Sequence, residues 1–434
     1  MNRTTKIFQI EDTDLFKQQL FEWAQSFQDI TYLDSHTAKN HQDFYSQFDA
    51  LLAVDAFTAI KTDALDGFSK LNDYQLITND WLFGFMSFEL KEDSHHLPSK
   101  QENLIDFPEL YFFQPKKLIL LKNNQVYCHY LPLCDDEIEV DFAAISAIHP
   151  MANKIDLASF ELKPRTSKAN YLQAANQLLA HIQRGDIYEI NYCLEFYADE
   201  ILINPFSVFK ALNNFAQSPF ASFFRSKDLF IMSATPERYL QRFDNKVVSQ
   251  PIKGTAKRFL DHLLDEKSKS DLKSNDKEIS ENVMIVDLVR NDLSITAKKK
   301  TVQVEELCEV YTFNQVHQMI STISSKVEQE TTSSTLLKTT FPMGSMTGAP
   351  KKSALFLIET FEDFRRGIYS GSVGYFDPKG NFDFNVIIRT LLYNAQKKYL
   401  SYGAGSALTA RADAEKEYEE CLLKVAMINQ IFKN

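Results

Sequence analysis

Residues 249–258 read SQPIKGTAKR, and this stretch places a lysine in an unusual setting. Pro251 fixes its own backbone φ angle and Gly254 turns freely, so we expect Lys253 between them on a shaped turn rather than on a loose surface loop. A lysine held in this way can be a nucleophile, or it can be an ordinary solvated cation. The residues that gather around it decide between the two.

The composition is that of a globular protein. The chain has 434 residues, of which 44% are hydrophobic and 24% are charged, enough for one large core or two smaller ones. The net charge of −11 argues against a nucleic-acid partner, because phosphate binding needs clustered Lys and Arg. The composition therefore favours an acidic enzyme.

The cysteines and the N-terminus indicate the compartment. Five cysteines form an odd set with neither CxxC nor Cys/His ligand spacing, which favours a reducing compartment over a disulfide framework or a zinc site. The N-terminus carries charges where an apolar signal core would lie, and no window approaches about 18 uninterrupted apolar residues. We expect a cytoplasmic protein that does not contact a membrane.

Composition divides the chain into two parts. Residues 1–150 are rich in aromatics and read as a sheet-forming scaffold, with strands in ELYFFQ and on both sides of Asn123-Asn124. Residues 166–184 have helical apolar spacing and a following Gly185. Eight of the twelve glycines fall between Gly344 and Gly405, which favours a binding site in the core, residues 151–434. We expect both parts to form one intertwined unit.

Two pairs of glutamates form the clearest acidic pattern. Glu278 and Glu281 lie three residues apart on a predicted helix, and Glu417 and Glu420 repeat that spacing in the C-terminal helix. If the helices face each other, four carboxylates surround one space, which is tolerable around a cation such as Mg²⁺. The alternative is that both pairs are solvated helix faces.

Two further charged residues have open interpretations. Glu237, in SATPERYL, follows a predicted strand end, where it can be a general acid with a raised pKa or a surface partner of Arg238. Arg389 interrupts the apolar strand run FNVIIRTLLY, so its burial would need an anion. That anion can be a substrate carboxylate or a structural Asp or Glu.

Six phrases in one order then point to a family. The sequences PIKGTAKR, SENVMIVDLVRNDL, GSMTGAPKKSA, YSGSVGYF, FNVIIRTLL and EKEYEECLLK, together with their surroundings over roughly residues 165–430, resemble the chorismate-utilising enzymes. The resemblance implies an α+β fold of two large, mostly antiparallel sheets packed as a sandwich with helices outside. It also implies that chorismate and Mg²⁺ bind in the cleft between the sheets. Separately, YLDS, from Tyr32 to Ser35, looks like an element that lines a tryptophan pocket in the anthranilate branch.

The resemblance also assigns roles to residues. Glu281 and Glu420 match direct Mg²⁺ ligands, with Glu278 and Glu417 binding directly or through water, and Glu237 matches the general acid that protonates the leaving hydroxyl. The positions that hold the substrate are matched by Arg389, Tyr369, the backbone around Gly403, Gly405 and Ser406, and the small hydroxyl residues Ser345 and Thr347.

Lys253 indicates the branch of the family. PIKGT resembles the phrase of aminodeoxychorismate synthases, in which the lysine is the nucleophile, whereas anthranilate synthases typically have PIAGT. Lysine attack at C2 of chorismate expels the C4 hydroxyl, and ammonia then attacks C4 and expels the lysine. Lys253 must be neutral to attack, which we expect burial and the metal to favour. The implied product is 4-amino-4-deoxychorismate, on the route to 4-aminobenzoate and folate.

Other readings and departures remain. The chain shows no glutaminase motif, so ammonia is expected from a separate glutamine amidotransferase subunit. The rivals are anthranilate synthase component I, isochorismate or salicylate synthase, and a non-catalytic chorismate or tryptophan sensor. Glu189 stands where the isochorismate and salicylate branches have a water-activating lysine, which disfavours them. Gln318 replaces a histidine usual in anthranilate synthases, and Ala407 and Arg411 replace a common glycine and aspartate.

Overall fold

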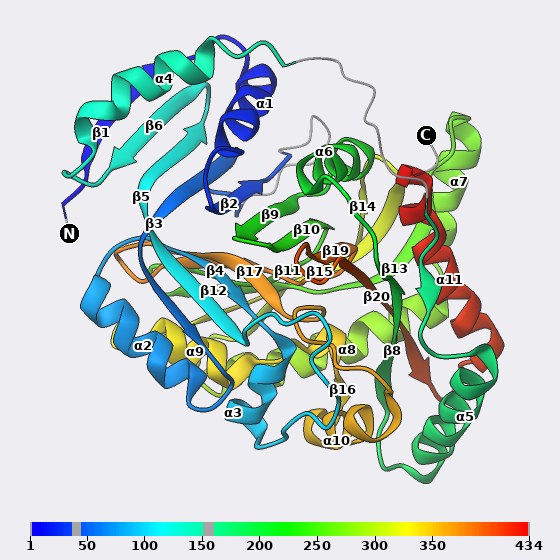
Figure 1. Cartoon of the computed structure of the whole chain (residues 1–434). Coiled ribbons are helices and arrows are strands. Elements are labelled where there is room, and N and C mark those ends of the chain that lie inside the picture. The colour runs from blue at the N-terminus through cyan, green and yellow to red at the C-terminus, as the bar shows by residue number, and fades with distance from the viewer. Residues whose placement is uncertain (1, 37–44, 151–159, 433–434) are drawn as a thin grey trace.

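Antiparallel strands build most of this protein. A computed structural model describes residues 2–36, 45–150 and 160–432, and within those ranges it has twenty strands and eleven α-helices (Figure 1). Every strand pairing in these ranges is antiparallel. The strands are β1 (Thr4–Gln9), β2 (Asp29–Asp34), β3 (Ala50–Thr62), β4 (Leu82–Met86), β5 (Leu110–Lys122), β6 (Gln125–Tyr130), β7 (Lys163–Pro164), β8 (Glu189–Ala198), β9 (Phe220–Ser226), β10 (Leu229–Thr235), β11 (Arg238–Phe243), β12 (Lys246–Gln250), β13 (Ile252–Lys257), β14 (Gln303–Thr312), β15 (Val316–Lys326), β16 (Gly348–Ala349), β17 (Ser372–Phe376), β18 (Phe382–Asn385), β19 (Thr390–Asn394) and β20 (Tyr399–Thr409).

The helices lie outside the strands. They are α1 (Thr13–Ala24), α2 (Gly67–Thr78), α3 (Lys91–His95), α4 (Ile138–Ser146), α5 (Lys168–Arg184), α6 (Pro205–Ala216), α7 (His262–Lys273), α8 (Asp276–Ser294), α9 (Ser333–Thr340), α10 (Lys351–Phe361) and α11 (Ala414–Asn429).

Two sheets pack against each other, and β5 belongs to both. One sheet runs through β8, β20, β19, β10, β9, β2, β3, β5, β6 and β1. The other runs from the first half of β5 through β4, β17, β18, β11, β12 and β15, with β13 and β14 also paired to β15. The fold is therefore the α+β sandwich that the family resemblance implies, with its two sheets joined into one hydrogen-bonded network.

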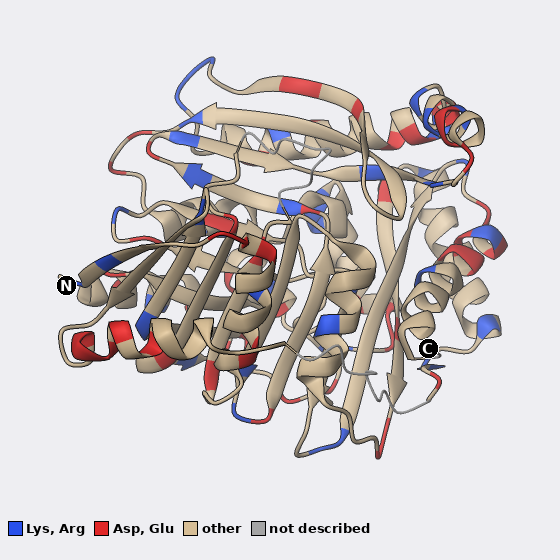
Figure 2. Ribbon diagram, turned by 90° about the horizontal axis from the view of Figure 1, so that it is seen from above, with Lys and Arg blue, Asp and Glu red and all other residues tan. Residues whose placement is uncertain are grey.

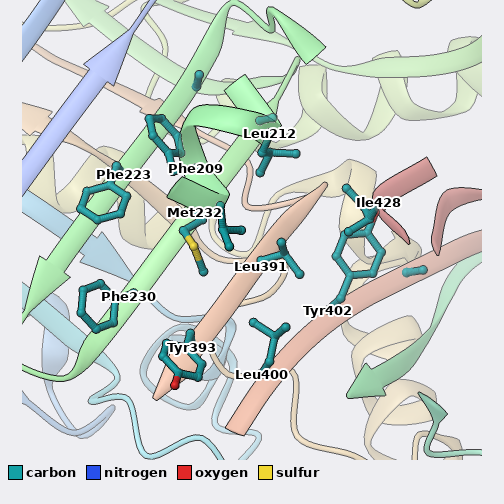
Figure 3. Packing of buried hydrophobic residues seen from close by; sticks show 14 of the residues in the cluster. Phe209, Leu212, Phe223, Phe230, Met232, Leu391, Tyr393, Leu400, Tyr402 and Ile428 are labelled. Carbon is teal, nitrogen blue, oxygen red and sulfur yellow. The ribbon is translucent and has the colours of Figure 1, made fainter. Parts of the chain in front are cut away.

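Aromatic and aliphatic side chains fill both faces of the first sheet. Between the sheets, Phe85 of β4 meets Phe224 of β9 edge to face, with ring centroids 5.0 Å apart. On the outer face, residues of α1, α5, α6 and α11 complete a second cluster. Figure 3 shows part of this outer cluster, where Phe209 and Leu212 of α6 lie near Met232 of β10 and Leu391 of β19.

The local predictions from sequence are confirmed at several elements. Asn123 and Asn124 turn the chain between β5 and β6, both with positive φ, as a two-residue hairpin requires. Helix α5 begins after Ser167, whose side chain accepts a hydrogen bond from the Asn170 amide, and ends at Gly185 with φ of 83°.

Residues 1–150 and residues 151–434, the two parts predicted from composition, contribute strands to the same sheets. Strands β2 and β4 pair with β9 and β17, so hydrogen bonds cross the expected boundary at residue 150. The division into a scaffold and a catalytic core stays a prediction.

The predicted strand around Arg389 is wrong in one respect. The run divides into β18 and β19, and Arg389 stands between them with φ of 51°, in the left-handed region that costs a non-glycine residue free energy. The apolar pattern gave no sign of this break.

Charged residues lie mainly on the helices and loops. Figure 2 shows segments of Lys and Arg interspersed with segments of Asp and Glu, while long stretches of the strands carry neither. All five cysteines are free thiols. Across the described ranges, no helix is both long and apolar enough to cross a bilayer.

Candidate active site

A cavity of about 410 Å³ lies where β13, β20, α8 and α11 come together. Its size is typical of a small-molecule site. All but one of the residues predicted for the site line it, namely Lys253, Glu237, Glu278, Glu281, Glu417, Glu420, Ser345, Tyr369, Arg389, Gly403, Gly405 and Ser406. Residues from distant parts of the sequence thus meet in one space.

A break in a strand brings Lys253 to this cavity. Strands β12 and β13 both pair with β15, and Pro251 stands between them. The pairing shifts register between Ile252 and Thr255, and Gly254 has φ of 96°, so the strand bulges at Lys253. A side chain at position 254 would come within 3.2 Å of the Glu278 carboxylate, which favours glycine there. The predicted turn is therefore a glycine bulge in a paired strand.

The charge around Lys253 is negative. Its Nζ lies 3.0 Å from Oε1 of Glu189, and its side chain is 13% exposed. Burial opposes the charged form, but the carboxylates of Glu189, Glu281 and Glu237 outweigh it and raise the pKa of Lys253 above its ordinary value. Burial therefore does not by itself produce the neutral lysine that was expected, because it brings carboxylates as well as apolar surroundings.

Glu237 is buried, which contradicts its interpretation as a surface partner of Arg238. It is 3% exposed, and Arg238 binds Asp383 instead at 2.9 Å. Burial raises the pKa of Glu237 to about 7, although a hydrogen bond with Ser345 and the nearby Lys253 act in the opposite direction. A carboxyl group of this kind can donate a proton near neutral pH.

The two acidic pairs face one cavity from two helices. Glu278 and Glu281 project from α8, and Glu417 and Glu420 project from α11. Lys277 lies between them, with its Nζ 3.1 Å from Glu417 and 3.8 Å from Glu281. The interpretation as solvated helix faces holds only for Glu420, whose side chain is 47% exposed and lies 2.8 Å from Lys424.

The carboxylates differ in how well positive charge compensates them. Burial raises the pKa of Glu281 to about 7, although Lys253 and Lys277 act against this, and Oε1 of Glu281 has no hydrogen-bond partner. Burial and the charge of Glu420 also raise the pKa of Glu417. At Glu420 burial acts in the same direction, but Lys424 outweighs it and lowers the pKa.

The donor set suits a hard cation. Carboxylate oxygens are the ligands that Mg²⁺ prefers, and Oε1 of Glu281, which has no hydrogen-bond partner, is free to bind a cation. In the described residues, however, no three Asp, Glu, His or Cys side chains come together closely enough to hold a metal. The residues fit Mg²⁺ in their chemistry, and the Lys277 ammonium stands between Glu281 and Glu417.

Arg389 is available to an anion. It makes no ion pair with any Asp or Glu of the described chain, so the structural partner considered from sequence is not found there. Burial lowers the pKa of Arg389, while Tyr402 and Glu237 nearby favour its charged form. A substrate carboxylate would supply the missing charge.

Near Arg389, part of β20 has backbone groups on one edge that pair with no other strand. The strand pairs with β19 only as far as Tyr402, so one edge of the segment from Gly403 onward faces the cavity. A side chain at position 403 would lie 2.3 Å from Cγ of Tyr369, because the Tyr369 ring packs on this backbone. Glycine at position 403 therefore allows the Tyr369 ring and the unpaired edge of β20 to line the same side of the cavity.

Thr347 is the one predicted site residue that does not line the cavity. Its hydroxyl donates to the carbonyls of Met343 and Gly344, so it stabilises the turn that carries Ser345. Gln318 and Ala407 do line the cavity, and Oε1 of Gln318 has no hydrogen-bond partner.

Lys277 and Lys424 were missed as site residues, and Glu189 was considered only as evidence against the isochorismate and salicylate branches. The spacing i, i+4 between Lys277 and Glu281, and between Glu420 and Lys424, was a signal for the two lysines. The ion pair of Glu189 with Lys253 had no local signal, since the two residues are 64 positions apart in the chain.

The segment at residues 32–35, which was expected to line a tryptophan pocket, does not line the large cavity. Leu33, Asp34 and Ser35 border a separate cavity of about 60 Å³. Burial disfavours an ionised Asp34, but Lys17, 2.8 Å away, and His36 outweigh it and lower its pKa to about 2. Tryptophan binding there stays a prediction.

Comparisons with known proteins identify the family of this chain. The chain matches the chorismate binding enzyme family over residues 16–430. It is 33% identical over 351 residues to an anthranilate synthase component I-like protein of Synechocystis sp., covering 79% of this chain and 70% of that protein. It is 30% identical over 349 residues to aminodeoxychorismate synthase component 1 of Klebsiella aerogenes, covering 80% and 75%.

A solved structure supports the fold. Anthranilate synthase component I from Streptococcus pneumoniae superposes with a TM-score of 0.77 at 23% identity, covering 90% of this chain and 94% of that one. Since the family match covers nearly the whole sequence, this chain belongs to the chorismate binding enzymes.

The pKa of Glu237 predicts a pH-dependent stability. Because burial raises this pKa from 4.5 to about 7, the folded protein keeps a proton that the unfolded chain releases between these values. Stability contributed by Glu237 is therefore lost as pH rises through this window. We expect Glu237→Gln, which cannot ionise, to gain melting temperature relative to wild type from pH 5 to 7 and then to keep a constant advantage. If the difference in melting temperature between Glu237→Gln and wild type stayed the same from pH 5 to 8, Glu237 would not be a buried, protonated carboxyl group.

Proposed function

We propose that this protein converts chorismate and ammonia to 4-amino-4-deoxychorismate, as an aminodeoxychorismate synthase component I. The observation that carries this proposal is Lys253, which a glycine bulge directs into the cavity beside Glu237 and the acidic pairs. Anthranilate synthase component I is the alternative within the family, and in that case Lys253 would have no role as a nucleophile.

In the proposed reaction the chain's own residues bind, orient and transfer protons. Arg389, Tyr369 and the open edge of β20 hold the substrate carboxylates, and Ser345 lies beside the general acid. The Lys253 amine attacks C2 of chorismate while Glu237 protonates the departing C4 hydroxyl. Ammonia then attacks C4, and the bond between C2 and Lys253 breaks.

We propose that Glu278, Glu281, Glu417 and Glu420 hold Mg²⁺. Bound there, Mg²⁺ would hold the ring carboxylate and stabilise the charge that develops as the hydroxyl leaves. Glu281 supports this proposal, because its Oε1 has no hydrogen-bond partner and lies 3.8 Å from the Lys277 ammonium.

The ammonia source and the setting are part of the same proposal. A separate glutamine amidotransferase subunit would deliver ammonia, and free ammonium would replace it in vitro. The product would enter the route to 4-aminobenzoate and folate in the cytoplasm, where the five free cysteines stay reduced.

A product assay tests the reaction. Purified protein with chorismate, Mg²⁺ and ammonium should yield 4-aminobenzoate only when aminodeoxychorismate lyase is added, as followed by chromatography. Lys253→Ala should lower turnover by at least about 100-fold, the size typical of losing a catalytic side chain. Lys257→Ala, an exposed lysine of the same strand, is the matched control and should stay within about twofold of wild type. Fluorescent anthranilate from the wild type would place the chain in the tryptophan branch, and no product would favour a binding protein.

Metal binding can be tested without turnover. Mg²⁺ should raise the melting temperature, because a ligand that binds only the folded state at 100 times its Kd stabilises it by about 2.7 kcal/mol. Glu281→Gln should lose most of this shift, whereas Glu419→Gln, an exposed neighbour outside the cavity, should keep it. Equal Mg²⁺ shifts in wild type and Glu281→Gln would contradict the proposed metal site.

A further inference from the structure

Glu189 is a buried carboxylate with a rigid backbone. It is the first residue of β8, where it pairs with Thr409 of β20 on one edge and with Ala349 of β16 on the other. A side chain at position 348 would lie 2.2 Å from the Glu189 carbonyl oxygen, so Gly348 allows β16 to approach this closely. Glu189 is 1% exposed. Pairing on both edges therefore fixes the backbone position of Glu189.

The side chain of Glu189 meets Lys253 from behind the cavity. Oε1 lies 3.0 Å from Nζ of Lys253, whereas Oε2 has no hydrogen-bond partner. Lys253 lines the cavity and Glu189 does not. A buried carboxylate oxygen without a hydrogen-bond partner is costly, so its presence beside Lys253 calls for a functional reason.

Lys253 needs a proton acceptor if it is to attack. The surrounding carboxylates favour its ammonium form, and an ammonium has no lone pair for a ring carbon. Glu237 cannot serve as the acceptor, because the same step requires it to donate a proton to the leaving hydroxyl. Among the described residues, Glu189 is the carboxylate that forms an ion pair with Nζ of Lys253.

We propose that Glu189 is a catalytic base that removes a proton from Lys253 as the amine attacks chorismate, and returns it when the amine is released. This inference rests on the proposed function.

The protons balance over the cycle. Lys253 gives one proton to Glu189 and forms the bond to C2, the C4–O bond breaks, and Glu237 protonates the oxygen, which leaves as water. Ammonia bonds to C4, the C2–N bond breaks, and the free amine recovers its proton from Glu189. The new ammonium at C4 supplies the proton that returns to Glu237.

A pure counter-ion would have a different signature. If Glu189 is only a counter-ion, an amide of the same shape can still hydrogen-bond to Lys253 but removes a charge that favours the ammonium, so turnover near neutral pH should stay equal or rise. If Glu189 takes the proton, its removal leaves solvent as the acceptor, and turnover should increase with pH as more of Lys253 loses its proton to water.

The test is Glu189→Gln, assayed for turnover from pH 6 to 9.5 with saturating ammonia. We expect kcat to fall by about 100-fold near neutral pH, the lower range for general base catalysis, with a chorismate KM close to that of wild type. The loss should shrink as pH rises. Glu195→Gln, which removes a second buried carboxylate of β8 that does not line the cavity, should keep the wild-type pH profile.

The outcomes separate this inference from the proposed function. Chorismate binding and the melting curve first establish that Glu189→Gln is folded. If wild type makes aminodeoxychorismate and Glu189→Gln has either full activity or an equal loss at every pH, the function stands and the base is refuted. If wild type makes another product, the proposed function fails.

Discussion

Buried carboxylates without enough positive charge are the constraint on which this site depends. Five glutamates line one cavity, where burial disfavours their ionised forms, and a sixth lies behind it. Lys253, Lys277 and Lys424 each compensate part of this charge, and the remainder is visible as raised pKa values and unsatisfied oxygens. A site arranged in this way is prepared for a cation and for proton transfer.

The sandwich keeps this unfavourable arrangement in place. Helices α8 and α11, which are far apart in the sequence, bring the two acidic pairs together, while β8, β13 and β20 bring Glu189, Lys253 and the unpaired backbone edge. Helices α8 and α11 and strands β8 and β20 each bury apolar residues in one of the two large hydrophobic clusters, and Ile252 of β13 packs against a smaller third cluster. Packing free energy spread over the whole fold therefore offsets the local electrostatic cost.

Sequence reasoning succeeds where a local pattern carries the information. Glu278 and Glu281 share a helix face because the α-helix has 3.6 residues per turn. Gly254 has a positive φ, as the sequence Pro-Ile-Lys-Gly predicts for a turn that glycine permits. It fails where the information is tertiary. The partner of Lys253 comes from a strand 64 residues earlier, Arg238 prefers Asp383 to its neighbour Glu237, and Thr347 turns its hydroxyl to the backbone. Six phrases in order gave the fold and most of the cavity, but the protonation of Lys253 follows only from the charges that surround it in space.

The most direct test of the central claim is to detect the bond to Lys253. Protein mixed with chorismate and Mg²⁺ but no ammonia would be quenched with acid within one turnover, digested, and mapped by mass spectrometry. The account predicts that the peptide containing Lys253 carries the mass of chorismate less one water, and that added ammonia removes it. Turnover with ammonia but no adduct, or an adduct on a different residue, would contradict the account.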